Sequence, residues 1–308
     1  MQDYHILSQS FLQQKKFLGY SYRTEEIALK EIVTFLKGRD ITKEVTEEYA
    51  RMNRNRHSNT IARNMGVLRE FCKYLKTQGV PCYQIPKKIY PQNHKSYTPY
   101  IFSHSEIKTI YQNLEVALKG YHYSYYQKLA YPLVIKILYQ TGMRLGEVLR
   151  VQKQDYLIED GCFHLKNTKN NQERLVFLPD TLKQEMNFFF HKFHYQWEEE
   201  TFIFSISSST IEQYFYKVLK LSHIPRRENS PRVHNLRQTF VVHRIEEYVN
   251  DGKDINVILP ILQKHLGHQS LEALSYYFHL TKDILGEIRM MSEYEFNDLI
   301  PEVKYEEF

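Results

Sequence analysis

The sequence predicts a mainly α-helical protein of two domains, with one small antiparallel β-sheet in the second domain. Three observations support this fold class. Apolar residues recur with the helical period over most of the 308 residues. Only CFHL and RLVFL, within residues 161–179, have the pattern of short strands, and a polar, Asn-rich turn joins them. A basic segment with four prolines, VPCYQIPKKIYPQNHKSYTPY, separates the two helical parts.

The first domain is expected over residues 1–85, followed by a linker at 86–97. Apolar positions between residues 8 and 37 indicate two helices that break near Gly19. A later helix ends at Gly79 and is clearer, because its apolar residues alternate in spacings of four and three, as one helical face requires. These residues are Ile61, Met65, Leu68, Cys72 and Leu75.

Positive charge is concentrated in this first domain. Residues 51–100 hold 10 Lys and Arg against one acidic residue, Glu70, whereas residues 101–308 hold 24 against 27. Such a surface is either a solvated basic face or one that binds the phosphates of a nucleic acid. The candidate DNA-binding residues lie off the apolar face of the helix that ends at Gly79, and they are Arg63, Arg69, Lys73 and Lys76.

The second domain is expected over residues 98–308, with a tail from about residue 285. Ser103 and Glu106 have the spacing of a capping box at the start of its first helix. An apolar helix, YPLVIKILYQ, precedes the two strands. Further helices are expected at about 181–194, 208–221, 235–249, 255–265 and 270–280. The tail contains acidic and apolar residues, so we expect it to pack either on its own domain or on a neighbouring protomer.

Several classes of protein are excluded by what the sequence lacks. The cysteines, Cys72, Cys82 and Cys162, are odd in number and widely spaced, which argues against a disulfide framework or a cysteine zinc site. No glycine-rich phosphate loop and no H-E-x-x-H motif occur, so neither a nucleotide cofactor nor a metal is expected. No signal peptide or membrane span is expected, and the predicted location is the cytoplasm, on the nucleoid.

Arg144 lies in TGMRLGEVLR, between two glycines and at the expected start of a helix. One interpretation is a surface arginine paired with Glu147. The other is an anion site, because helix N-termini favour anions and a guanidinium donates to two phosphate oxygens at once.

Three more motifs bear on this choice. His234 and Arg237 lie in HNLRQTF at the expected start of another helix, His268 in LGHQS, and Tyr277 nine residues later in SYYFHL. Each of them alone is more typical of a structural residue. His265, His268 and His279 also offer metal ligands, although the motifs of common zinc sites are missing.

In this order and spacing, the motifs R-x-G-E, H-x-L-R, L-G-H and the final tyrosine resemble those of the tyrosine recombinase, or phage integrase, family. The resemblance covers nearly the whole chain and implies a helical core-binding domain and a catalytic domain that form a clamp around DNA. It implies a hairpin lysine as well, best matched by Lys169, with Lys166 as the alternative. The implied catalytic residues are Arg144, Lys169, His234, Arg237, His268 and Tyr277.

The resemblance also implies a reaction and partners. Tyr277 would attack a DNA phosphate and form a 3′-phosphotyrosyl bond, so that strands are cut and rejoined without a cofactor. The partners would be double-stranded DNA with specific core sites and further copies of the chain, a dimer on each site and a tetramer in synapsis, with accessory or sister recombinases. The alternatives are a type IB topoisomerase and an inactive DNA-binding relative. The target sequence, and the choice among integration, excision, resolution and inversion, stay open.

Overall fold

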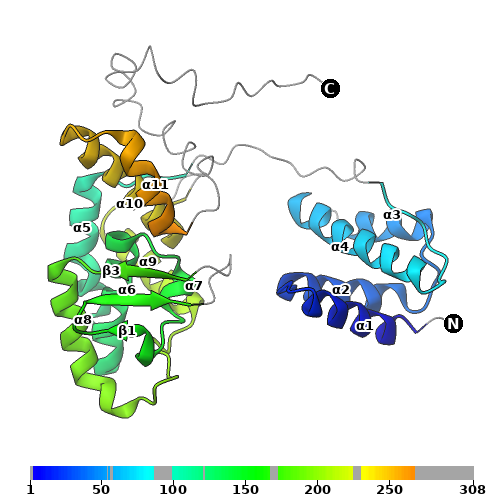
Figure 1. Cartoon of the computed structure of the whole chain (residues 1–308), viewed down its shortest axis with the longest axis horizontal. Coiled ribbons are helices and arrows are strands. Elements are labelled where there is room, and N and C mark those ends of the chain that lie inside the picture. Colours follow the sequence, from blue (N-terminus) through cyan, green and yellow to red (C-terminus); the bar gives the residue numbers. More distant parts are fainter. Residues whose placement is uncertain are drawn as a thin grey trace. The chain divides into compact units, whose positions relative to one another are not determined.

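The chain divides into two compact units, Met1–Tyr97 and Thr98–Phe308 (Figure 1), and each contains a hydrophobic core of its own. The computed structural model describes residues 3–53, 55, 58–86, 99–120, 122–166, 173–224 and 230–267. The two units are therefore considered separately.

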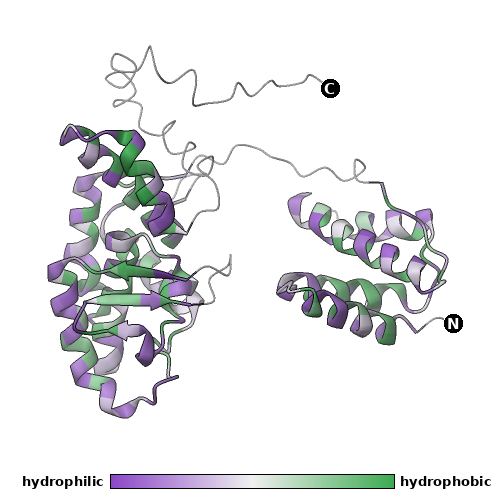
Figure 2. Ribbon diagram, viewed as in Figure 1, coloured by the Kyte–Doolittle hydropathy of each residue, from purple (hydrophilic) through white to green (hydrophobic). Residues whose placement is uncertain are grey.

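The described part of the first unit is helical: α1 Tyr4–Phe17, α2 Arg23–Leu36, α3 Lys43–Met52 and α4 Ser58–Thr77. The helices bury their apolar faces against one another (Figure 2). On α4, Met65, Leu68, Cys72 and Leu75 are all at most 1% exposed, as the periodicity of that segment predicts.

The second unit is built around α6, Tyr125–Thr141, which is buried along most of its length. Helix α6 contacts the helices that surround it in this unit: α5 His104–Leu114, α7 Leu145–Val148, α8 Asp180–Phe193, α9 Ser208–Leu221 and α10 Val233–Asn250. Helix α11, Ile255–Leu266, packs on α10 and on the sheet. The shorter 3-10 turns are η2 Val116–Leu118, η3 Lys153–Asp155 and η4 His194–Gln196.

The sheet of the second unit is antiparallel, in the order β1-β2-β3. Its strands are β1 Tyr156–Leu157, β2 Cys162–Leu165 and β3 Arg174–Phe177. Phe163 of β2 pairs with Val176 of β3, and both are fully buried. Along β3 the exposed Leu175 and Phe177 alternate with Arg174 and Val176, so Arg174 points toward the protein interior.

The predicted fold class, mainly α with a small antiparallel sheet, is confirmed, and so is the capping box of Ser103 and Glu106. Two elements were missed. Helix α3 has only Thr46 and Tyr49 buried, which gives too few apolar positions for a periodic pattern. Strand β1 has two residues, too short for alternation to be visible. The helix expected at 270–280 and the tail lie outside the described residues. Within the described part of the chain, the helices are too short or too polar to cross a membrane.

Candidate active site

Arg144 is positioned by a tight turn between α6 and α7. Gly142 ends α6 with a φ of +65°, which L-residues with side chains rarely adopt. A Cβ atom there would lie 2.4 Å from the ring of Phe240 on α10. Only glycine lets the chain turn here while α10 packs against it. Arg144 then caps α7, and 27% of its side chain is exposed.

A buried carboxylate, Glu147, holds Arg144 in place. Its Oε1 lies 2.8 Å from Nη1 of Arg144, and its Oε2 lies 2.8 Å from Nη2 of Arg174. Burial alone would raise the pKa of Glu147, but the hydrogen bonds and charge of Arg174 and the bonds from Arg144 outweigh it and lower the pKa to about 2. Arg144 therefore forms the ion pair with Glu147 that the sequence suggested. The pair is not a simple surface contact, because the carboxylate is 4% exposed and also pairs with Arg174.

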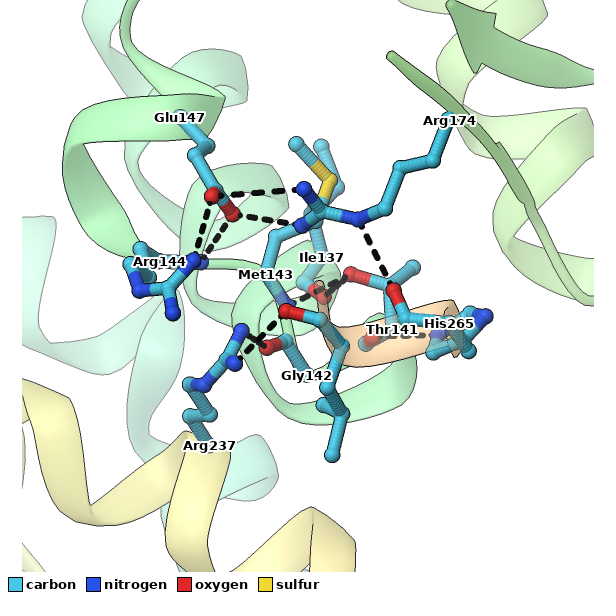
Figure 3. A network of polar contacts seen from close by, with 10 residues as sticks. Ile137, Thr141, Gly142, Met143, Arg144, Glu147, Arg174, Arg237 and His265 are labelled. Carbon is cyan, nitrogen blue, oxygen red and sulfur yellow. Dashed lines mark hydrogen bonds and ion pairs between the residues drawn. The ribbon is translucent and has the colours of Figure 1, made fainter. Parts of the chain in front are cut away.

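The same network fastens β3 and α11 to this turn (Figure 3). Arg174 of β3 donates from Nε to the carbonyl of His265, 2.8 Å away. His265 in turn contacts the carbonyl of Thr141 through Nε2, at 2.8 Å. Burial lowers the pKa of His265, with nearby arginines adding to the effect, so a neutral ring that donates to Thr141 is favoured. The hairpin strand and the end of α11 are thus tied to the α6–α7 turn.

Arg237 reaches the same turn from α10. It is 2% exposed and donates to the carbonyls of Gly142, at 2.6 Å, and Leu266, at 2.9 Å. The motif predicts Arg237 in the first helical turn, but α10 begins at Val233, so Arg237 is the fifth residue. The helix starts early because the side chain of Asn235 accepts the backbone N–H of Arg232. Backbone carbonyls, rather than a helix N-terminus, orient this guanidinium.

His234 and Arg144 line one groove. It has a volume of about 1710 Å³ and lies between the start of α7, helix α9 and the start of α10. His234 is exposed at the groove, but surrounding protein lowers the pKa of its ring, and the charges of Arg237 and Arg144 lower it further. At neutral pH the imidazole is therefore uncharged and able to accept a proton.

Of the two candidate hairpin lysines, Lys166 lies within the described residues. Lys166 follows β2, and its ammonium lies 3.1 Å from Oδ1 of Asp155, a carboxylate that is 11% exposed. No aligned hydrogen bond reaches that oxygen from the described residues, so the contact is an ion pair. Lys169, His268 and Tyr277 lie outside the described residues, as do the tail and His279. His268 follows directly in sequence on Gly267, which ends α11 and lies against Arg174.

Known proteins identify the family. The profile described as the phage integrase family matches residues 101–283, more than half of the chain. The chain belongs to this family. The putative integrase/recombinase y4rE of Sinorhizobium fredii is 22% identical to it over 285 residues, which cover 87% of this chain and 89% of the relative. The tyrosine recombinase XerA of Saccharolobus solfataricus is 31% identical over 153 residues, 50% of this chain and 47% of XerA.

Solved structures of DNA-bound recombinases share the fold of this phage integrase family member. The post-cleavage complex of XerH with palindromic difH has a TM-score of 0.63 and 19% identity, covering 88% of this chain and 79% of XerH. A lambda integrase dimer on a COC′ core site has a TM-score of 0.59 and 17% identity, covering 89% and 76%. The chain is thus a tyrosine-type site-specific recombinase, an enzyme of DNA recombination.

The four basic residues expected to bind DNA differ in their surroundings in the recombinase. Arg69 donates to the carbonyls of Ile85 and Pro86, at 2.8 and 3.0 Å, and holds the chain that leaves α4. Lys73 is 2.7 Å from Glu70. Lys73, Arg63 and Lys76 are all exposed. Arg69, Lys73 and Lys76 follow one another at i, i+4 and i+7 and share a face of α4, while Arg63 lies on another face.

Two residues that hold the candidate site together were not predicted from the sequence. Glu147 entered only as a surface partner of Arg144, although its place three residues after a helix cap is a signal for a capping carboxylate. Arg174 was assigned to a strand without a role. Its position in phase with the buried Val176 marked it as inward-pointing, and a buried arginine needs a partner.

Proposed function

We propose that this recombinase cuts and rejoins DNA strands at specific sites through a 3′-phosphotyrosyl intermediate, with Tyr277 as the nucleophile. The observation that supports this best is the meeting of Arg144, Arg237 and His234. Two guanidiniums come to the α6–α7 turn from different helices, and an uncharged histidine lies beside them at an open groove. A phosphodiester is an anion, and its attack adds charge that such cations stabilise.

The steps follow from the residue types. The Tyr277 oxygen bonds to phosphorus as the bond from phosphorus to the 5′-oxygen breaks, which keeps the energy of the linkage. A phenol has an ordinary pKa of about 10, so its proton must be removed, and neutral His234 is the proposed acceptor. His268 would donate a hydrogen bond to a phosphate oxygen. Attack by the 5′-hydroxyl of a second strand reverses the step and releases the tyrosine.

The leaving 5′-oxygen needs a proton, and the proposed donor is Lys169. The ion pair of Lys166 with Asp155 supports this choice, because it commits the ammonium of Lys166, which follows β2, to the mostly buried carboxylate of η3. Glu147 is proposed as a positioning residue that acts through Arg144 and Arg174.

DNA binding is proposed for both units, which would close as a clamp on the duplex. The first unit would contribute Arg63, Arg69, Lys73 and Lys76. Structures of relatives support an assembly of several copies on DNA, since lambda integrase has been seen as a dimer on a core site and as a tetramer on a Holliday junction. We propose the same assemblies here, a dimer on each site and a tetramer in synapsis. The tail would dock on a neighbouring protomer.

A nicked duplex tests the proposal. Cleavage close to the nick releases a short strand end, so the protein stays trapped on DNA as a covalent adduct. The wild-type chain should form this adduct in EDTA, because no step uses a metal. Tyr277→Phe should bind with nearly unchanged affinity and form none.

Three results would count against the proposal. An adduct with Tyr277→Phe would assign the nucleophile to another residue, with Tyr276 the first to test. Failure of the wild-type chain to form an adduct on any site that it binds would leave an inactive DNA-binding relative. Relaxation of supercoils without strand exchange between two sites would indicate a topoisomerase of type IB.

A further inference from the structure

Three side chains that the proposed reaction does not use meet where the start of α5 contacts α10. His104 is the first residue of α5, whereas His243 and Glu246 belong to α10. Among the described residues, they are the one group of three histidine, cysteine or acidic side chains whose ligating atoms all lie within 4.8 Å of one another. Histidine nitrogens and carboxylate oxygens are ligands of zinc and similar divalent metals. The group therefore has the composition of a metal site.

The positions of the three side chains are close to those that a zinc ion requires. His243 and Glu246 are neighbours on one face of α10, at i and i+3. Nε2 of His104 lies 3.8 Å from Oε2 of Glu246, and its ring stacks on that of His243, with the centroids 3.8 Å apart. A tetrahedral zinc ion with bonds of about 2.1 Å spaces its ligand atoms about 3.4 Å apart. His104 is 65% exposed, so a small rotation of its side chain can complete the geometry.

The buried member of the group, His243, already has the kind of partner that orients metal-bound histidines. It is 4% exposed, and its Nδ1 lies 2.9 Å from the hydroxyl oxygen of Tyr139. When Nδ1 carries the proton and donates to that oxygen, Nε2 keeps a lone pair for a metal. The carbonyl of Phe102 also interacts with the ring, and a metal on the same nitrogen would replace that contact.

The charges around the group also favour a cation. The positive charge of Arg244 acts on His243, but Arg244 forms an ion pair with Glu247, 2.6 Å away, which offsets that charge. The carboxylate of Glu246 then adds the negative charge that attracts a divalent ion. Both histidines bind a metal in their neutral form, so a zinc ion on these three ligands would keep one positive charge.

We infer that His104, His243 and Glu246 bind a zinc ion that joins the start of α5 to α10, with water as the fourth ligand. The ion stabilises the second unit and takes no part in strand cleavage. Arg237 precedes His243 by six positions on α10, a rise of about 9 Å along the helix. The ligands come from helices that are far apart in the sequence, so no short motif marks the site.

Zinc binding to the full-length chain tests the inference. The protein is stripped with EDTA, transferred to metal-free buffer and titrated with zinc chloride in a calorimeter, and its melting temperature is measured with and without zinc. At a hundredfold excess of zinc over Kd, the melting temperature of the wild-type chain should rise by roughly 5 to 10 °C. His104→Ala and Glu246→Gln should each weaken this binding at least about 100-fold, because each removes a direct ligand.

Two controls accompany this titration. His164 and Glu173 form a histidine–carboxylate pair, 3.1 Å apart, that belongs to no group of three ligands among the described residues. His164→Ala should therefore bind zinc as the wild-type chain does. Magnesium should produce neither the heat nor the rise in melting temperature, because it prefers six oxygen ligands. His104 is exposed, so His104→Ala should keep the fold, and circular dichroism without metal checks this.

Several results would overturn the inference. If the wild-type chain binds no zinc, the three side chains form no metal site. If His104→Ala or Glu246→Gln binds zinc with wild-type affinity, the metal lies on other residues. An equal loss of affinity in His164→Ala, or an equal response to magnesium, would likewise exclude a specific site at α5 and α10. Neither measurement uses DNA, so these outcomes are independent of the proposed reaction.

Discussion

At the scale of single residues, the two lysines between β2 and β3 are expected to differ in their roles. Lys169→Ala should be nearly inactive on ordinary DNA, because an alkoxide leaves poorly without a proton. With sulfur in place of the bridging 5′-oxygen, activity should return, since a thiol has a pKa of only about 8.5. Adduct formation on both substrates measures this.

Lys166→Ala is the matched control. Its ammonium pairs with Asp155, so the variant should retain adduct formation on ordinary DNA and gain nothing from sulfur. The opposite pattern, rescue of Lys166→Ala and full activity of Lys169→Ala, would reverse the two roles. Arg144→Ala should be rescued little, because its proposed contacts are to the non-bridging oxygens.

Glu147 provides a second prediction at this scale. Glu147→Gln removes the charge that two arginines share, and breaking a buried pair of this kind costs about 3 to 5 kcal/mol. Glu185 pairs with Lys136 at the surface with 46% of its side chain exposed, so Glu185→Gln should cost at most about 1 kcal/mol. Urea unfolding measures both. Equal losses would mean that Glu147 has no special structural role.

At the scale of elements, the turn between α6 and α7 depends on Gly142. Gly142→Ala adds a methyl group against Phe240 in a backbone conformation that disfavours alanine. Gly120 has a similar φ of +78° with nothing within 4 Å of its would-be Cβ, so Gly120→Ala isolates the backbone cost, about 1 kcal/mol. Gly142→Ala should cost about 1 to 3 kcal/mol more, from overpacking. Equal melting temperatures for the two variants would show that α10 moves aside.

The elements also show what a sequence can reveal. Helix α4 was predicted because apolar residues recur on one face of this 20-residue helix. Helix α5 was predicted because its capping box depends on residues that are close in sequence. The motifs predicted that Arg144, His234 and Arg237 lie in or near the first turn of a helix, because a helix start depends on residues that are close in sequence. The sharing of Glu147 by Arg144 and Arg174 was not predictable, because it depends on how β3 packs against α7. Nor did the pattern reveal that Arg237 bonds to carbonyls at the ends of α6 and α11.

At the scale of the whole molecule, DNA affinity should depend on salt through the first unit. Replacing Arg63, Lys73 and Lys76 by glutamine should flatten the log–log salt dependence of binding by up to about 2.7, at about 0.9 per lost phosphate contact. Arg69 is kept, because it also holds the chain after α4. Replacing the exposed Lys30 of α2, Lys37 at its C-cap and Lys43 of α3 removes equal charge elsewhere. An equal change of slope in this control would place the DNA surface on another face.

Stability of the molecule should fall in mild acid. Burial, with the charge of His104, lowers the pKa of His243 from 6.5 to about 4. Between these values the unfolded chain binds a proton that the folded chain does not, so stability is lost as the pH drops from 6.5 to 4. This residue alone contributes up to about 3 kcal/mol. Urea unfolding across this window should show a smaller loss for His243→Gln, and an unchanged loss would assign the acid sensitivity to other groups.

Three basic side chains of the candidate active site have a feature in common. Arg237, Arg174 and His265 bond to main-chain carbonyls of four residues, Thr141, Gly142, His265 and Leu266. A carbonyl stays in place when its side chain is replaced, provided that the backbone keeps its path. Substitutions of these four residues that keep the backbone path should therefore leave the site intact. The constraint falls instead on Gly142 and Gly267, whose left-handed backbone and close neighbours admit little besides glycine.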